Sequence, residues 1–234
     1  MGIAVLLIMV AAGYLSGSVS YAMLIARGLS GKDIREMGNR NPGTLNVGVN
    51  LGMGWGILVA LLDALKSFVP MLVTSMLLAG EDGRFVFLAV VATGMAAIVG
   101  HWKPLFHGFR GGQAVGSAIG VFLFAIPLEF LISFVAAGLF GLLVMRRRDA
   151  KWMRWVPISL VFIVPVLATA LNALFDLRLF AFVSLGGHPW YRIAGIWAVC
   201  FLMLGINVRY LRKRLGGAVT DAGGVNGKRG AGLP

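Results

Sequence analysis

The segment "HGFRGGQAV", residues 107–115, places Arg110 directly before a glycine pair and Gln113 directly after it. Glycines ahead of a helix leave backbone N–H groups uncovered, and these groups suit a phosphate or a carboxylate. The Arg110 guanidinium could add a two-pronged contact to the same anion. The segment predicts either an anion site that includes Gly111 and Gly112, or a glycine hinge beside an ordinary loop arginine.

Two ionisable residues, Asp63 and Lys66, lie inside an apolar stretch at residues 54–79. Side chains three positions apart share one face of a helix, so this spacing predicts an ion pair. Charged groups at membrane depth are costly and usually face a polar cavity or each other. Both a functional site and a purely structural pair fit this pattern.

The histidines and the cysteine indicate no metal centre. His101 and His107 are six positions apart, which is not a one-face helical spacing, and His188 lies far along the chain. Cys200 is the only cysteine, so the sequence offers neither a disulfide framework nor a cysteine-based metal site. We therefore expect no metal and no cofactor.

The loop after the first apolar stretch, residues 27–53, is unusually long for a helix connection. Its sequence, "RGLSGKDIREMGNRNPGTLNVGVNLGM", carries four asparagines and many glycines. Long loops are usually either functional or disordered. The apolar residues spread through this one favour an ordered, functional loop.

The composition predicts that these segments are positioned by membrane helices. Hydrophobic residues make up 59% of the chain, charged residues only 13%, and the mean hydropathy is +0.87. A soluble domain of this length cannot bury so much apolar surface. The net charge of +12 sits in short segments between apolar runs, a pattern that orients membrane loops, so we expect no nucleic-acid partner.

The apolar segments are residues 3–26, 54–79, 85–101, 114–145, 155–175 and 191–208. The fourth has 32 residues and would extend about 48 Å as one helix, against a hydrocarbon core of about 30 Å. Pro127 and Glu129 lie in its middle, so we predict two helices there. The chain is thus expected to be an all-α integral membrane protein with about seven transmembrane helices.

The basic residues predict the orientation of these helices. With seven spans, most Lys and Arg residues fall on one side, including the run at 146–154 and those that follow residue 208. The positive-inside rule makes that side cytoplasmic, with the N-terminus outside and the C-terminus cytoplasmic. We expect one polytopic membrane domain over residues 1–215 and a glycine-rich, disordered cytoplasmic tail over 216–234.

Several segments resemble, in order, those of the bacterial acyl-phosphate:glycerol-3-phosphate acyltransferase family. They are "GSVSYAMLIARGLSGKDIREMGN" with the "NPGTLNVG" that follows, then "LLDALKS", then "GHWKPLFHGFRGGQAVGSAIG", and more loosely "NVRYLRKR". The third of these is specific, with Gly100, His101, Pro104, Phe106, Gly108, Phe109, Gly111, Gly112 and Val115 in register.

The resemblance implies a seven-helix bacterial inner-membrane enzyme whose motifs lie in three cytoplasmic loops. Such an enzyme transfers a fatty acyl group from acyl phosphate to the 1-hydroxyl of glycerol 3-phosphate, forming lysophosphatidic acid in the first step of phospholipid synthesis. Its partners would be these two substrates and membrane lipids. Acyl phosphate is already activated, so positioning and charge neutralisation suffice without a protein nucleophile.

The resemblance assigns substrate or phosphate binding to a set of residues and leaves the catalytic residues open. The set is Asn39, Arg40, Asn41, Gly43, Asn46, Asp63, Lys66, His101, Arg110, Gly111, Gly112, Gln113 and Asn207.

The chain differs from the family at several of these positions. Asn39 and Arg40 stand where the family has serine and glycine. Val49 replaces a family arginine, and Gln113 replaces the lysine after the glycine pair. Arg110 replaces the lysine before that pair and keeps its charge. Two phosphate-facing cations are therefore missing, each worth roughly 1.5–3 kcal/mol if it makes a charge-assisted hydrogen bond.

The third segment also differs, since the family histidine and asparagine correspond to Asn207 and Tyr210. Arg40 and Arg209 are additional cations near these gaps. One hypothesis is that Arg40 has taken over a phosphate contact that the missing cations would make. The substitutions leave three functions open: a divergent acyltransferase, a catalytically impaired member that binds lipid phosphate or regulates, and a transporter of lipid or small anions.

Overall fold

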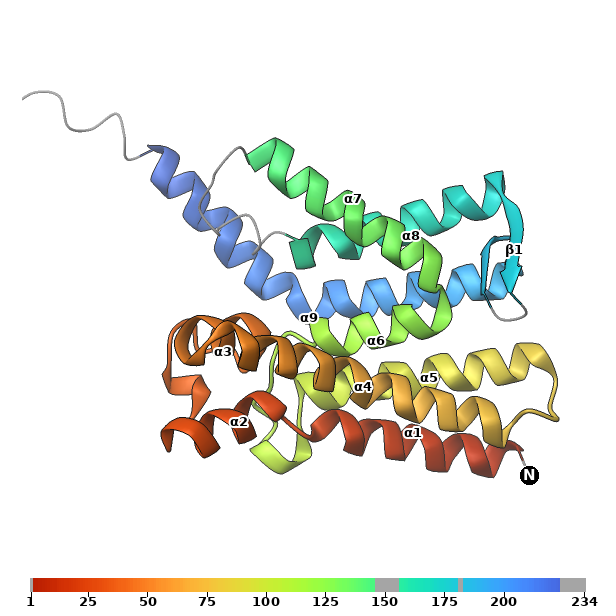
Figure 1. The fold of residues 1–234 in the computed structure, drawn as a ribbon, viewed down its shortest axis with the longest axis horizontal. Coiled ribbons are helices and arrows are strands. Elements are labelled where there is room, and N and C mark those ends of the chain that lie inside the picture. The colour runs from red at the N-terminus through yellow and green to blue at the C-terminus, as the bar shows by residue number, and fades with distance from the viewer. Residues whose placement is uncertain (1, 146–155, 181–182, 224–234) are drawn as a thin grey trace, which may run out of the picture.

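The computed structural model describes residues 2–145, 156–180 and 183–223, which form helices and one β-hairpin (Figure 1). The elements in chain order are α1 (Gly2–Ser18), α2 (Tyr21–Ser30), η1 (Ile34–Glu36), α3 (Thr44–Leu51), α4 (Met53–Leu77), α5 (Gly83–Trp102), η2 (Leu105–His107), α6 (Val115–Ala125), α7 (Pro127–Met145), α8 (Val156–Leu174), β1 (Asp176–Phe180), β2 (Val183–Gly186) and α9 (Trp190–Gly223).

The long apolar segment at 114–145 divides where the sequence predicts. Helix α6 ends at Ala125 and α7 begins at Pro127, with Ile126 between them in a non-helical conformation. Proline is favoured at the first position of a helix because its missing N–H has no helical partner there. Figure 1 shows α7 running back from the end of α6, so the prediction of two helices is confirmed.

Four helical segments of the described chain are long and apolar enough to cross a membrane, namely 2–30, 53–77, 83–107 and 190–208. Three shorter apolar helices cover 115–125, 127–139 and 160–174. Together they correspond to the seven predicted helices. The number of true spans, and the compartment in which each terminus lies, stay predictions.

The helices form two groups with α6 between them. In Figure 1, α1 to α5 lie below and α7 to α9 above, and α6 contacts α4, α5, α7 and α9. Helices α1 and α5 approach closely because Gly13 and Gly17 face Thr93 and Ala97 without side chains between the backbones. Small residues spaced four apart commonly allow such contacts between membrane helices.

The segments that resemble the family motifs gather at one end of this bundle. In Figure 1 the left end holds α2, α3 and the turn after α5, and α9 runs toward that side. The basic run at 146–154 lies outside the described residues. Helix α9 continues to Gly223, past the boundary at residue 216 where we expected a disordered tail, and residues 224–234 are not described.

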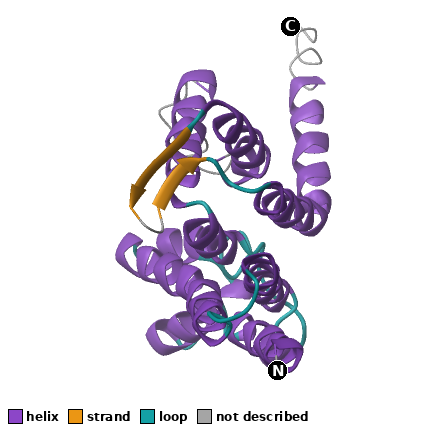
Figure 2. Ribbon diagram, turned by 90° about the vertical axis from the view of Figure 1, so that its right-hand side faces the viewer, coloured by secondary structure: helices purple, strands orange, loops and turns teal. Residues whose placement is uncertain are grey.

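The opposite end carries the hairpin, whose strands pair antiparallel beside α7 and α8 (Figure 2). Glu129, fully buried in the first turn of α7, accepts hydrogen bonds through Oε1 from the Gly186 N–H and from Nε2 of His188, both at 2.9 Å. Asn172 bonds the backbone of His188 at 2.6 and 3.2 Å. Glu129 thus ties the hairpin and the residues after it to α7, and Asn172 ties them to α8.

Candidate active site

A buried polar cluster joins α4, α5 and α6 beneath the motif loops. Nζ of Lys66 lies 2.9 Å from Oδ1 of Asp63, and the side chains are 1% and 3% exposed. Nδ1 of His101 lies 3.7 Å from the same oxygen and 3.2 Å from Oγ of Ser117. The predicted pair between Asp63 and Lys66 is confirmed, and it forms part of a larger cluster that includes a histidine.

A break in the first apolar segment supplies another partner for Lys66. The predicted helix over 3–26 divides into α1 and α2 around Val19, whose carbonyl accepts a hydrogen bond from Nζ of Lys66 at 3.0 Å. No described group makes a hydrogen bond to Oδ1 of Asp63, so its contact with Lys66 is ionic without hydrogen-bond geometry. Nζ of Lys66 therefore has a hydrogen-bond partner among the described residues, whereas Oδ1 of Asp63 has none.

The glycine pair lies directly on the end of α5. The N–H of Gly111 donates to the carbonyl of Trp102 at 3.2 Å, and the N–H of Gly112 donates to the carbonyl of His101 at 3.1 Å. The prediction that these two N–H groups are bare is therefore wrong, because the turn folds back onto α5 and uses them. Sequence inspection could not detect this, since the acceptors belong to the preceding helix.

The backbone N–H groups that lack a carbonyl partner lie slightly farther along the chain. In the described structure, the N–H groups of residues 113–117 donate to no carbonyl, and the first helical bond of α6 runs from Ala118 to Ala114. These groups carry the positive end of the α6 dipole. Anion binding by this segment thus stays a prediction, with its donors moved from the glycine pair to the start of α6.

The two residues that flank the glycine pair have different roles in the structure. Arg110 is exposed, and its guanidinium makes no hydrogen bond or ion pair with the described residues. The carbonyl of Gln113 accepts a hydrogen bond at 3.2 Å from Nδ2 of Asn207, which also donates to the carbonyl of Met203 at 2.9 Å. The second and third motif segments therefore meet at Gln113 and Asn207. The side chains of Arg209 and Tyr210 lie outside the described part.

Asn46 is buried and holds the first loop together. Its Nδ2 donates to the carbonyls of Ile34 and Met37, each at 3.0 Å. Its Oδ1 accepts from the Asn39 N–H at 3.2 Å and from Nδ2 of Asn50 at 2.9 Å. An amide side chain has two donor hydrogens and one acceptor oxygen, so these bonds occupy all of its groups. In this conformation Asn46 stabilises the loop and has no free hydrogen-bonding group for a substrate.

The neighbouring loop residues are more exposed to solvent than Asn46. Oδ1 of Asn39 accepts from the N–H of Asn41 at 2.9 Å, a local turn in which both residues stay at least partly exposed. Arg40 is exposed and has a φ of +61°. Gly43 is the N-cap residue of α3 and, through its carbonyl, accepts the N–H of Asn46 at 3.1 Å. Arg40 is thus the cation that the first loop leaves accessible beside these asparagines.

Two contacts show that the first and second loops are packed together. A Cβ on Gly112 would lie 2.9 Å from the carbonyl oxygen of Pro42 and 2.6 Å from Nε2 of His101. The guanidinium of Arg35 also reaches carbonyls of the second loop. Arg35 and Ser117 were not among the predicted site residues. In the sequence, Arg35 is one of the basic residues of the 27–53 loop, which count toward the orientation of the helices, and Ser117 lies within an apolar segment, so neither stood out.

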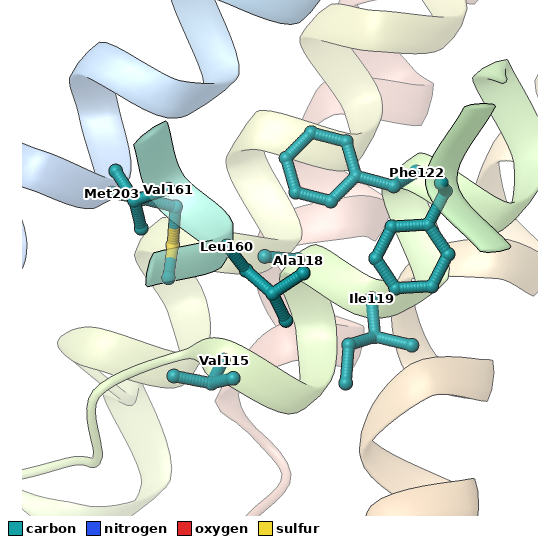
Figure 3. A pocket seen from close by; sticks show the side chains of 8 residues that line it. Val115, Ala118, Ile119, Phe122, Leu160, Val161 and Met203 are labelled. Carbon is teal, nitrogen blue, oxygen red and sulfur yellow. The ribbon is translucent and has the colours of Figure 1, made fainter. Parts of the chain in front are cut away.

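An apolar cavity lies beside this polar region (Figure 3). It is narrow, with a free volume of about 20 Å³, and is lined by Val115, Ala118, Ile119, Phe122, Phe130, Leu160, Val161 and Met203. Val115 follows Gln113 by two residues, and Met203 precedes Asn207 by one helical turn. Since Gln113 and Asn207 contact each other, the cavity begins next to their polar junction.

Comparisons with known proteins agree along most of the chain. A family model described as glycerol-3-phosphate acyltransferase matches residues 7–213. A glycerol-3-phosphate acyltransferase of Anaeromyxobacter sp. (strain Fw109-5) is 43% identical over 132 residues, which cover 56% of this chain and 64% of that protein. The protein of the same name from Aquifex aeolicus is 33% identical over 184 residues, which cover 78% of this chain and 81% of that one.

The fold is also similar to a solved structure. The crystal structure of PlsY (YgiH), an integral membrane glycerol 3-phosphate acyltransferase, in its glycerol 3-phosphate form, matches with a TM-score of 0.69 at 27% identity. The match covers 91% of this chain and 92% of that one. The lysophosphatidic acid form of PlsY matches with a TM-score of 0.66. The predicted helical integral membrane fold is thereby confirmed, with the hairpin as an addition.

Proposed function

Because the chain belongs to the glycerol-3-phosphate acyltransferase family, we propose that it transfers a fatty acyl group from acyl phosphate to glycerol 3-phosphate. The products are lysophosphatidic acid and inorganic phosphate. The enzyme acts in the bacterial inner membrane, where lipids surround its helices and the motif loops face the cytoplasm. It needs no cofactor, because the acyl phosphate bond is already activated.

The observation that carries this proposal is the junction of polar and apolar regions at Gln113 and Asn207. Exposed cations, Arg40 and Arg110, lie on the two packed loops at the same end of the bundle. Buried His101 lies under the glycine pair, and the apolar cavity begins one helical turn away. Both substrates carry phosphate and one carries a lipid tail, so a site of this composition matches their chemistry.

The reaction exchanges one acyl–oxygen bond for another. The 1-hydroxyl oxygen of glycerol 3-phosphate bonds to the acyl carbonyl carbon, the bond from that carbon to the phosphate oxygen breaks, and the hydroxyl proton leaves with phosphate. The protein orients the two phosphates and offsets their charge, which stabilises the transition state. Arg110 is the residue we assign to the acyl phosphate, because it is a freely projecting cation next to the N–H groups of residues 113–117.

The proposal is tested by acyl transfer with purified protein in lipid cubic phase, using palmitoyl phosphate and glycerol 3-phosphate. Both lysophosphatidic acid and phosphate should appear in equal amounts. Arg110→Ala should lower kcat/KM roughly 10- to 100-fold, as for one lost charge-assisted hydrogen bond, and Arg110→Lys should retain most activity. Absence of product from folded wild-type protein would refute the proposed acyltransferase activity.

A second candidate is a catalytically impaired family member that binds lipid phosphate or acts in regulation. It is favoured by two uncharged residues, Gln113 and Val49, which stand at positions where the family has cations. The Val49 side chain is 79% exposed. In the same preparation this candidate would bind lysophosphatidic acid in an Arg110-dependent way while forming no product.

Arg40 provides a prediction about how the missing cations are compensated. Its φ of +61° is a conformation that glycine, the family residue, adopts freely, whereas other residues lose about 1–2 kcal/mol. Arg40→Gly should therefore stabilise the protein by about 1 kcal/mol, seen as a higher Tm in detergent. If Arg40 also binds phosphate, the same variant should raise the KM for glycerol 3-phosphate about tenfold, and an unchanged KM would contradict that role.

The apolar cavity provides a prediction about the acyl chain, which we propose enters it. Ile119→Trp should close this narrow space, so that the chain can no longer bury methylene groups along it, each worth about 0.8 kcal/mol when buried. The ratio of kcat/KM for palmitoyl phosphate over decanoyl phosphate should fall roughly tenfold. Leu123→Trp, one turn along α6 and outside the cavity lining, is the matched control and should keep the wild-type ratio.

A further inference from the structure

Arg35 links the first loop to the turn that precedes the glycine pair. Its Nη1 donates to the carbonyl of His107 and to the carbonyl of Arg110, each at 3.3 Å. Among the described residues no other side chain bonds the backbone between residues 107 and 110. Arg35 lies 72 and 75 positions before these two residues in the sequence, so the bonds exist only because the two loops are folded against each other.

Asp33 holds the guanidinium in this orientation. Its carboxylate accepts from Nε of Arg35 at 3.0 Å and from Nη2 at 2.7 Å, a bidentate pair, and also accepts the N–H of Arg35 at 2.9 Å. Arg27 adds a third cationic contact at 3.0 Å from its more exposed side chain. Bidentate geometry of this kind fixes direction as well as distance.

The charge of this pair is insensitive to pH near neutrality. The hydrogen bond from the Arg35 side chain holds the pKa of the Asp33 carboxyl far below its usual range. A lowered pKa means that the stabilisation is fully present above the ordinary aspartate pKa of about 3.9 and is lost only as the pH falls further. Arg35 therefore stays fixed at every pH where the enzyme would work.

The turn that Arg35 holds is strained. Gly108 and Phe109 both have positive φ, of +63° and +57°, and the second is unfavourable for a residue with a side chain. Phe109 is also half exposed, so packing does not hold it in place. Strained conformations persist where surrounding contacts determine them. The two carbonyls that Arg35 binds, those of His107 and Arg110, lie on either side of this pair.

We propose that Arg35 is a positioning residue, whose guanidinium, held by Asp33, fixes the 107–110 turn and so the backbone from which the Arg110 side chain projects. This proposal rests on the proposed function of that site. Arg35 does not touch substrate; it acts through Arg110. Its contribution therefore disappears when the Arg110 side chain is absent, which separates positioning from direct binding.

The test is a double-mutant cycle on acyl transfer. Arg35→Ala should lower kcat/KM about tenfold in the wild-type background and less than twofold in the Arg110→Ala background. Arg110→Ala keeps the carbonyl that Arg35 binds, so the comparison removes only the side chain. Arg27→Ala is the matched control, since Arg27 shares Asp33 but makes no hydrogen bond to the turn among the described residues, and it should leave kcat/KM unchanged. Equal losses in both backgrounds would overturn the proposal.

Hydrogen exchange gives a readout that does not depend on activity. The N–H of Phe109 donates to the carbonyl of Pro104 at 2.9 Å, and that of Arg110 to the carbonyl of His107 at 3.4 Å. In Arg35→Ala, peptides covering 103–114 should exchange at least several-fold faster, with no change in Arg27→Ala. If the wild type transfers no acyl group, the proposed function fails while this measurement still decides whether Arg35 fixes the turn; unchanged exchange overturns it.

Discussion

Replacing Gly112 with alanine should lower acyl transfer by about 100-fold or more while leaving the helices intact. The new Cβ would lie 2.6 Å from Nε2 of His101 and 2.9 Å from the carbonyl oxygen of Pro42. Both distances are shorter than those that real Cβ atoms make, and the Pro42 oxygen is a backbone atom. The glycine pair must then move away from α5 and from the first loop. Displacements near 1 Å in a substrate-positioning group cost about 100-fold in rate.

The measurement is kcat/KM for both substrates beside a thermal unfolding curve of the same preparation. Gly54→Ala is the matched control, because Gly54 lies in α4 and no atom is within 4 Å of a Cβ built there. That variant should keep its activity and gain slightly in helix stability. Wild-type activity in Gly112→Ala would mean that the close contact between the two loops and α5 is not required for the reaction.

Removing the Lys66 charge should destabilise the protein by about 3–5 kcal/mol, because it leaves the Asp63 carboxylate buried without its cation. His101, 3.7 Å from Asp63, is the only other described group positioned to compensate by taking a proton. Lys66→Met is a suitable change, since methionine fills similar space without charge. The expected result is a large fall in Tm in detergent and loss of acyl transfer.

The double variant Asp63→Asn with Lys66→Met separates structure from function. It removes both charges, so it should regain most of the stability that the single variant loses. If acyl transfer returns with it, the pair is purely structural, as one interpretation of the sequence holds. We expect stability to return without activity, because Asp63 contacts His101 under the glycine pair and would no longer hold that ring in place.

Much of the fold could be predicted from local features of the sequence. The i to i+3 spacing of Asp63 and Lys66 predicted a pair on one helix face, and the structure places their charged atoms 2.9 Å apart. The length of the apolar segment 114–145 and the position of Pro127 predicted its division, because the segment exceeds one membrane span and proline is favoured at the first position of a helix. The most specific part of the family resemblance was residues 100–120, where glycine and proline constrain the backbone of a turn that returns onto its own helix.

The candidate site depended on contacts that local features do not contain. Gly111 and Gly112 looked like free donors, yet their N–H groups bond carbonyls of α5. Asn46 looked like a substrate contact, yet its amide is occupied by the first loop. Arg35 looked like one of several orienting charges, yet it bridges to the second loop. In each case the deciding partner lies in another segment, so only folding brings it near.

The sequence by itself determined that this protein is a helical membrane protein of the glycerol-3-phosphate acyltransferase family, because hydropathy, proline positions and the spacing of motif residues act locally along the chain. The tertiary structure alone decided which polar groups remain available to a substrate. Backbone and amide groups bond whatever acceptor or donor the fold places nearest, and these partners lie up to 94 positions away, as in the contact between Asn207 and Gln113.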